Sequence, residues 1–234
     1  MPALKIALLG AESTGKTTLA RALAERLRAR TSRVAVVGEV LREWCAREGR
    51  APRPEEHLAI AQKHERRVDE AAAQADIVIA DTTALMVAIW GGLLFADDPL
   101  WRFALERQRG YALNLVTGLD LPWVADGLQR QGPQAREPVD ALVREGLEKA
   151  GVAWQVVYGS GQERVRKPLE AIAEVAPWAW TAQEQAEPRW RGLCDACSDP
   201  DCEHRLFRGL MGRSRAEAAS LRRTLAPGFP PSRE

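Results

Sequence analysis

The sequence predicts an α/β fold of three layers, in which helices cover both faces of a mostly parallel five-stranded sheet, followed by a small cysteine-containing C-terminal tail. Two observations lead to this prediction. Short apolar runs alternate with helical patterns along most of the chain, which is typical of parallel strands joined by crossover helices. The alternation stops near Pro177, so we expect one domain over residues 1–176 and an extension over residues 177–234.

The expected elements follow one another in a regular order. Residues 5–10 (KIALLG) form a short apolar run ended by glycine, which suits a buried parallel strand. Leucines at every fourth position, Leu19, Leu23 and Leu27, predict an amphipathic helix after it. Further strands are expected at residues 34–39, 76–81, 111–117 and 154–158. Helices are expected from residue 40 to an interruption at 49–54, and then over 55–75 and 84–95. A further helix is expected after the polar stretch 126–138 and ends near residue 150, and the last covers 162–175.

The composition argues against several classes of protein. The 234 residues include 33 basic and 32 acidic side chains, so the net charge does not indicate a nucleic acid or an anionic membrane as partner. No apolar run approaches the roughly 20 residues that span a bilayer, and the first apolar run is too short for a signal peptide. We therefore expect a cytoplasmic protein whose four cysteines are thiols or metal ligands.

A phosphate-binding loop follows the first predicted strand. The stretch GAESTGKTT fits the pattern G-x-x-x-x-G-K-[ST] between a strand and a helix. In such a P-loop the glycines let backbone N–H groups surround phosphate oxygens, and the helix dipole favours the anion. We expect Lys16 to reach the β and γ phosphates of ATP and Thr17 to hold Mg²⁺, within a P-loop NTPase fold. The predicted nucleotide-binding residues are Gly10, Ser13, Thr14, Gly15, Lys16, Thr17 and Thr18.

Two carboxylates end neighbouring predicted strands, at the edge where open α/β sheets bind ligands. Asp81 follows four apolar residues and is expected to hold Mg²⁺, directly or through water, although it could instead cap the next helix. Glu39 suits the orientation or deprotonation of an acceptor hydroxyl, and Arg42 lies one helical turn later, where it could bind a polar part of the substrate. A solvated Glu39–Arg42 ion pair is the alternative.

The segment LPWVADGLQRQG follows the fourth predicted strand. Trp123 lies near the ligand edge, where its ring could stack on a flat substrate, and Asp126 would favour positive charge there. Arg130 and Arg136 suit a lid that closes over the phosphates of ATP. The alternative is that Trp123 belongs to the core. Three other tryptophans lack such a position and are interpreted as packing residues: Trp44, Trp90 and Trp101.

This combination of motifs resembles the ribosylnicotinamide kinase domain found at the C-terminus of NadR-type proteins. The matching segments are GAESTGKTTLA, GEVLREW, IVIADTT and LPWVADGLQRQG, within roughly residues 3–175. The resemblance implies a step of NAD biosynthesis: ATP-dependent phosphorylation of the ribose 5′-hydroxyl of nicotinamide riboside to nicotinamide mononucleotide. It further implies that Trp123 stacks on the pyridinium ring, that Glu39 lies near the ribose, and that Asp81 lies near the metal or the acceptor hydroxyl.

The sequence also departs from NadR-type proteins. They carry a nucleotidyltransferase domain before the kinase, which we do not expect in this chain because its P-loop begins at Gly10, so we expect conversion to NAD to need another protein. The segment 91–109 is rich in tryptophan and leucine and need not preserve the substrate pocket of the family. A related nucleoside or vitamin-like acceptor therefore stays open.

The tail contains the stretch CDACSDPDCEHRLF. Its spacing, C-x2-C-x4-C-x-H, brings together three thiols and an imidazole, which is a ligand set for tetrahedral Zn²⁺: Cys194, Cys197, Cys202 and His204. Reduced cysteines without a metal are an equal alternative, and an iron–sulfur cluster is a third. A metal here would be structural, because so small a tail cannot bury its own core. Cys45, His57 and His64 are interpreted as packing or surface residues.

Two hypotheses from different classes result. The first is a kinase for a small nucleoside, and the second is a regulatory ATPase whose cysteine-rich tail docks another macromolecule. A guanine-specific switch would carry Asn-Lys-x-Asp after a later strand, where this chain has GLDLPW, and an AAA-type motor would usually be longer. The kinase hypothesis accounts for more residues and is the main prediction.

Overall fold

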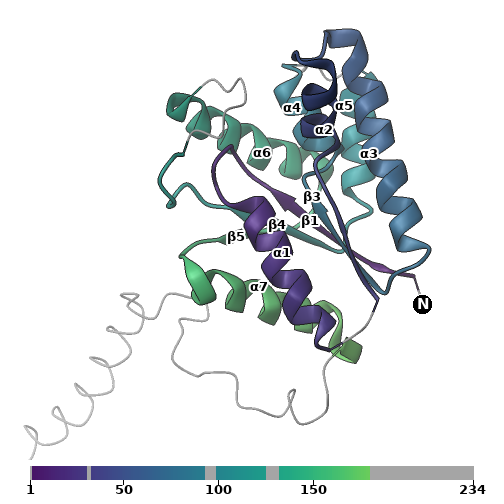
Figure 1. The fold of residues 1–234 in the computed structure, drawn as a ribbon, viewed down its shortest axis with the longest axis vertical. Helices are drawn as coiled ribbons and strands as arrows, with labels where there is room; N and C mark the ends of the chain where they lie inside the picture. Colours follow the sequence, from purple (N-terminus) through teal and green to yellow (C-terminus); the bar gives the residue numbers. More distant parts are fainter. Residues whose placement is uncertain (1, 31–32, 93–98, 125–131, 180–234) are drawn as a thin grey trace, which may run out of the picture. The chain divides into compact units, whose positions relative to one another are not determined.

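The computed structural model describes residues 2–30, 33–92, 99–124 and 132–179 (Figure 1). All of these residues belong to one unit, Met1–Thr181. The cysteine-rich tail lies outside the described residues, so the domain boundary near residue 176 stays a prediction. None of the described helices is both long enough and apolar enough to cross a membrane.

A five-stranded sheet forms the centre of the described domain, with the strand order β2-β3-β1-β4-β5. All four strand pairings are parallel, which confirms the predicted α/β class. The central strand β1 pairs with β3 on one side and with β4 on the other, so the chain that follows its carboxyl end lies at the middle of the sheet edge, where open α/β sheets bind ligands. The strands are β1 (Leu4–Leu9), β2 (Val34–Val37), β3 (Ile77–Asp81), β4 (Leu113–Thr117) and β5 (Gln155–Val157).

Helices cover both faces of the sheet, as the sequence predicted (Figure 1). On one face lie α1 (Lys16–Arg28) and α7 (Gly161–Val175), which pack on the sheet through a cluster of buried residues that includes Leu19, Leu23 and Leu27. The other face is covered by α3 (His57–Ala72), α4 (Ala84–Trp90), α5 (Pro99–Gln108) and α6 (Arg136–Ala150), and α2 (Val40–Glu48) packs on α3. Short 3₁₀ turns occur at Pro54–Glu56, Pro133–Ala135 and Pro177–Ala179.

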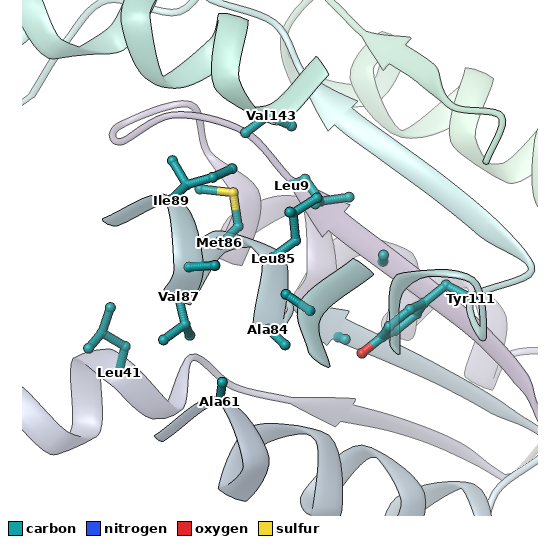
Figure 2. Close-up of a cluster of buried hydrophobic side chains, with 14 of the residues drawn as sticks. Leu9, Leu41, Ala61, Ala84, Leu85, Met86, Val87, Ile89, Tyr111 and Val143 are labelled. Atoms are coloured by element: carbon teal, nitrogen blue, oxygen red, sulfur yellow. The ribbon is translucent and has the colours of Figure 1, made fainter. Parts of the chain in front are cut away.

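Helix α4 is the most deeply buried of these helices. Its residues from Ala84 to Ile89 are all at most 4 % exposed, as expected for a helix that is apolar all round. In Figure 2 the side chains of Leu85 and Met86 lie among Leu9 of β1 and Val143 of α6. The helix therefore holds a fixed position between the sheet and the outer helices.

The region after α4 differs most from the prediction. The helix was expected to reach residue 95 but ends at Trp90, because the two glycines that follow form a turn and Gly92 has a φ of +66°. Helix α5 was not predicted, although it begins at Pro99 in the favourable first position of a helix. The remaining elements lie within a few residues of their expected bounds.

Candidate active site

The predicted P-loop connects β1 to α1 at the carboxyl edge of the sheet. Gly10 has a φ of +135°, and a Cβ added to it would stand 2.9 Å from the carbonyl oxygen of Thr117 in β4. Gly15 has a φ of +76° and precedes the first turn of α1. Both motif glycines are thus required, the first by close contact with β4 as well as by its backbone conformation.

A cavity of about 430 Å³ lies over this loop. Residues 13–18 line it, together with Arg42 and the segment after β4. No side chain caps the N-terminus of α1 in the described structure, so its first-turn N–H groups can bind an anion in the cavity. Ser13, Thr14, Gly15, Lys16, Thr17 and Thr18 therefore lie where the sequence predicted a phosphate site.

Lys16 lies at the base of this cavity. Its side chain is mostly buried, and Nζ donates hydrogen bonds to the carbonyl oxygens of Gly10 at 2.9 Å and of Ala11 at 2.7 Å. The ammonium group is thus held beside the loop, where it can turn to phosphate oxygens.

Thr17 and Asp81 meet, as two separate motifs predicted. Thr17 Oγ1 donates a hydrogen bond of 2.5 Å to Asp81 Oδ2. Asp81 is 3 % exposed, and its Oδ1 has no hydrogen-bond partner among the described residues. A buried carboxylate oxygen left without a donor is costly unless another group binds it. A hydroxyl beside a carboxylate fits Mg²⁺, which prefers oxygen ligands and takes the rest from phosphates and water.

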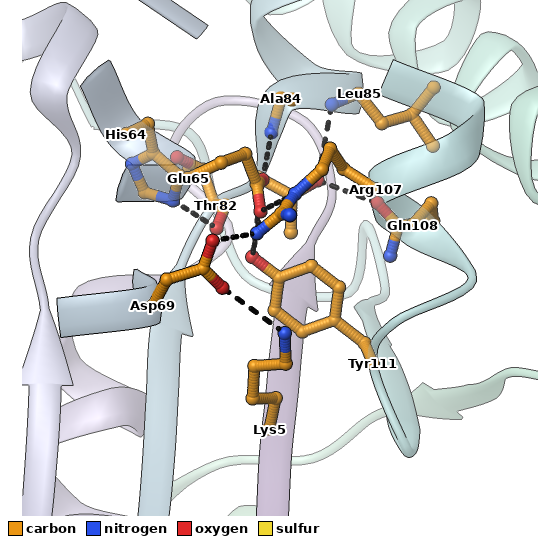
Figure 3. A network of polar contacts seen from close by, with 11 residues as sticks. Lys5, His64, Glu65, Asp69, Thr82, Ala84, Leu85, Arg107, Gln108 and Tyr111 are labelled. Carbon is orange, nitrogen blue, oxygen red and sulfur yellow. Dashed lines mark hydrogen bonds and ion pairs between the residues drawn. The ribbon is translucent and has the colours of Figure 1, made fainter. Parts of the chain in front are cut away.

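The backbone after Asp81 is held by a buried histidine. Thr82 has a φ of +82°, which is strained for a β-branched residue. Its N–H donates to the carbonyl oxygen of Leu8 at 3.1 Å, and its own carbonyl oxygen lies 3.1 Å from His64 Nε2 (Figure 3). Burial lowers the pKa of His64, so the ring is neutral and Nε2 carries the proton that it donates. His64 is thus a positioning residue, whereas the sequence analysis interpreted it as a packing or surface residue.

A second set of buried polar contacts fixes the start of α4 (Figure 3). Glu65 is 2 % exposed and accepts hydrogen bonds from the Ala84 N–H at 3.0 Å and from the Tyr111 hydroxyl at 3.2 Å. Arg107 Nε lies 3.3 Å from the same carboxylate and supplies the opposite charge. Burial raises the pKa of Tyr111, so its hydroxyl stays a donor. With the Thr83 hydroxyl capping α4, these contacts anchor the chain that directly follows Thr82.

A second cavity of about 870 Å³ adjoins the first. It lies among the P-loop, α2, the chain from residue 49 to 57, the end of α4 and the start of α6. Lys16 and Arg42 line both cavities. The phosphate site and the second cavity therefore meet at the P-loop lysine.

The predicted Glu39–Arg42 pair lies at this junction. Arg42 NH2 is 3.2 Å from Glu39 Oε2, and the Glu39 side chain is only 10 % exposed. Glu39 lines the second cavity. The ion pair therefore belongs to the cavity wall and is not a fully solvated surface pair.

The segment after β4 is tied to the P-loop. Ser13 Oγ donates to the carbonyl oxygen of Val124 at 3.1 Å and accepts from the Val124 N–H at 2.8 Å. Trp123 is half-buried but is not among the residues that line either cavity. Asp126 and Arg130 lie outside the described residues, so their roles stay predictions, as does stacking by Trp123.

Two arginines that line neither cavity hold segments near the P-loop. Arg136 begins α6, is mostly buried, and donates a hydrogen bond of 3.3 Å to the carbonyl oxygen of Leu119 in the segment after β4. Arg164 of α7 donates to the carbonyl oxygens of Thr14 at 2.7 Å and Gly159 at 2.8 Å. It thereby joins the P-loop to the end of β5. Sequence reasoning missed Arg164, because a single arginine in an amphipathic helix carries no motif.

Sequence reasoning also missed side chains of the second cavity. Trp90, Cys45 and His57 were interpreted as packing or surface residues, and all three line it. Burial and the nearby Glu39 carboxylate raise the pKa of the Cys45 thiol. No sequence motif marks Trp90, because the helix that carries it was expected to continue to residue 95. The predicted zinc ligands, Cys194, Cys197, Cys202 and His204, lie outside the described residues.

Solved structures share this fold at low sequence identity. A NadR protein in complex with NR is 18 % identical with a TM-score of 0.56, over 74 % of this chain and 50 % of that one. A NadR protein in complex with NAD and AMP-PNP is 17 % identical with a TM-score of 0.55, over 74 % of this chain and 49 % of that one. Thymidylate kinase from Ehrlichia chaffeensis is 15 % identical with a TM-score of 0.50, over 75 % of this chain and 100 % of that one.

The chain thus spans about half the length of the NadR proteins that it matches. No curated protein matches it in sequence. The sequence profile of the AAA domain family matches residues 5–164, which is more than half of the chain and runs from β1 into α7. The chain therefore belongs to the AAA domain family.

Proposed function

We propose that the chain is a P-loop kinase that transfers the γ-phosphate of ATP to a hydroxyl group of a small nucleoside. One observation carries the proposal: the cavity over the P-loop and the second cavity share Lys16 and Arg42. A donor phosphate bound in the first cavity would face an acceptor bound in the second. A regulatory ATPase has no need of a second cavity that opens on its phosphate lysine.

The donor half of the reaction follows from the P-loop. Lys16 leaves the carbonyl oxygens that it now contacts and binds β and γ phosphate oxygens, where its charge stabilises the transition state. Thr17 and Asp81 would hold Mg²⁺, which would neutralise charge on the phosphates. His64 and Thr82 keep the Asp81 backbone in place during the transfer.

The acceptor half depends on carboxylates near the junction. Glu39 lines the second cavity and forms an ion pair with Arg42, so its carboxylate can orient the acceptor hydroxyl or accept its proton. Asp81 is the alternative acceptor of that proton. In a loose transition state the orientation of the hydroxyl matters more than the strength of the base.

The charges of the second cavity favour a nucleoside over a nucleotide as the acceptor. Two arginines among the described residues line this cavity, and each is paired with a carboxylate. Arg42 pairs with Glu39, and Arg50 makes hydrogen bonds of 2.7 and 2.8 Å to both oxygens of Glu56. The Arg50 contacts lower the pKa of Glu56 to about 2, so this pair stays charged at neutral pH. An acceptor phosphate would have to compete with these carboxylates.

Nicotinamide riboside is the acceptor that we propose within this class. The segments quoted above resemble the ribosylnicotinamide kinase domain, and the fold is shared with a NadR protein solved in complex with NR. The second cavity is large enough for a nucleoside.

An ADP-release assay with Mg-ATP tests this proposal. Nicotinamide riboside, ordinary nucleosides, thymidine monophosphate and a control without acceptor are compared on the full chain. We expect release that depends on nicotinamide riboside and falls by about a thousandfold in Lys16→Ala. Lys149→Ala, at the far end of α6, is the matched control and should keep wild-type activity. Release that is independent of any acceptor would indicate a regulatory ATPase instead.

A further inference from the structure

The second cavity has an aromatic wall at the end of α4. Trp90 is the last residue of this helix, and it lines the cavity. The ammonium group of Lys16 lies 5.9 Å from the centre of the Trp90 ring. The ring is therefore beside the point at which the two cavities meet.

Helix α4 presents this ring from a fixed position. The helix begins three residues after Asp81, its other residues are almost fully buried, and Glu65 and Thr83 anchor its first turn. A Cβ added at Gly91 would stand 3.1 Å from the His57 ring, so the turn after Trp90 packs closely against that ring. A side chain on so rigid an element can orient a ligand with little loss of conformational entropy.

The wall around Trp90 is largely apolar. Its other members come from α2, α4 and α6: Leu41, Cys45, Ile89, Val139 and Leu142. A flat ring stacked on the indole there would lose water from the stacked face, and loss of water strengthens stacking and cation–π contacts. The polar residues Lys16 and Glu39 lie on the junction side, where the sugar hydroxyl must approach the phosphate.

We propose that Trp90 is the side chain that recognises the acceptor ring, and that the site prefers a nucleoside whose ring carries a positive charge. The inference rests on the proposed kinase function and assigns a residue to substrate specificity within it. Lys16 now places its ammonium group near the Trp90 ring; once Lys16 turns to the phosphates of ATP, the indole can take a cationic ring in its place. Trp123, in contrast, lines neither cavity among the described residues.

Binding of nicotinamide riboside to the full chain, saturated with AMP-PNP and Mg²⁺, tests the assignment by calorimetry. We expect Trp90→Leu, which keeps an apolar side chain but removes the aromatic face, to weaken binding by about 10- to 100-fold. Trp90→Phe should recover most of that loss, and the affinity for AMP-PNP should change little in either variant. In Trp90→Leu, the affinity for a neutral nucleoside should fall by less than the affinity for nicotinamide riboside. Trp178→Leu, at an exposed tryptophan that lines neither cavity, is the matched control and should bind as wild type. Trp123→Leu is measured beside it as the competing assignment.

Two negative results separate the inference from the proposed function. If the wild type transfers phosphate to nicotinamide riboside and Trp90→Leu, folded by circular dichroism, binds it normally, the assignment of Trp90 is wrong and the kinase stands. If only Trp123→Leu bound nicotinamide riboside more weakly than the wild type, Trp123 would be the residue that stacks on the ring. If the wild type neither binds nor phosphorylates any nucleoside, both the kinase proposal and the assignment of Trp90 fail.

Discussion

The two halves of the candidate site are built differently. Most of the phosphate half is one continuous segment between β1 and α1, whose backbone groups two glycines allow to come close together. The acceptor half is made of side chains from α2, α4, α6 and the chain around His57, which are distant in sequence. Backbone geometry fixes the first half, whereas side-chain identity fixes the second.

This difference separates chemistry from selectivity. Almost any change of backbone geometry in the phosphate half should impair both binding and catalysis, because its N–H groups must surround one ligand, a phosphate chain. A changed side chain in the acceptor half should alter which molecule is bound while the fold and the affinity for ATP are retained. Lys16 and Arg42 belong to both halves, so their substitution cannot distinguish the two.

Gly10→Ala should give the largest effect on stability, because it disturbs the backbone of the phosphate half. The new Cβ would meet the backbone of Thr117 at a φ of +135°, so we expect a loss of about 3 kcal/mol or more. Gly151→Ala at the end of α6 is the control, because its φ is also positive, at +68°, but open space surrounds it. That variant should lose only about 1 kcal/mol.

Urea unfolding followed by circular dichroism compares the two glycine variants. Equal losses would mean that backbone conformation alone matters at Gly10 and that the contact with β4 contributes nothing. A larger loss at Gly10 that is accompanied by loss of AMP-PNP binding would support the view that the phosphate half depends on close backbone packing.

The same difference explains how much the sequence could predict. Local conformational needs determine the P-loop, so Gly10, Gly15, Lys16 and Thr17 are recognisable from spacing, and Asp81 from its place at a strand end. Trp90 and His64 could not be assigned from the sequence, because their roles arise only when α3 and α4 pack beside β3. Helix α5 was missed because its short apolar pattern lies just after a glycine turn.

Glu39→Gln should give a smaller effect that is confined to the acceptor half. The variant keeps the size of the side chain but removes the charge that Arg42 pairs with at 3.2 Å. We expect the KM for the nucleoside acceptor to rise by about tenfold or more, which corresponds to the free energy lost when one hydrogen bond to a charged group is removed. The KM for ATP should not rise, because Arg42 then has one carboxylate fewer to hold it away from phosphates.

Steady-state kinetics with each substrate varied in turn measure this split. Glu43→Gln is a suitable control, since Glu43 lies in the first turn of α2, which begins directly after Glu39, and pairs with Arg67 in a more exposed position. If Glu39→Gln raised the KM for ATP as much as that for the acceptor, the separation of the two halves at Glu39 would be wrong.

The smallest effect concerns the pH dependence of stability, which arises beside the phosphate half. Burial lowers the pKa of His64 in the folded protein, with Glu65, Asp81 and Arg67 as its charged neighbours, whereas the unfolded chain takes up the proton near pH 6.5. The unfolded state therefore binds more protons below that pH, and the free energy of unfolding should fall as pH is lowered from 7 to 5. A single group can contribute at most about 1.4 kcal/mol per pH unit.

His64→Gln removes this titration but keeps an amide N–H that can reach the carbonyl oxygen of Thr82. Its free energy of unfolding should be nearly flat between pH 7 and 5.5, where carboxylates remain ionised, while the wild type loses stability. If the free energy of unfolding of the variant depended on pH as steeply as that of the wild type, another group would be responsible for the pH dependence. A flat slope with unchanged kcat at pH 7.5 would mean that the phosphate half needs the hydrogen bond to Thr82 and not the imidazole itself, which fits a half that depends on backbone geometry.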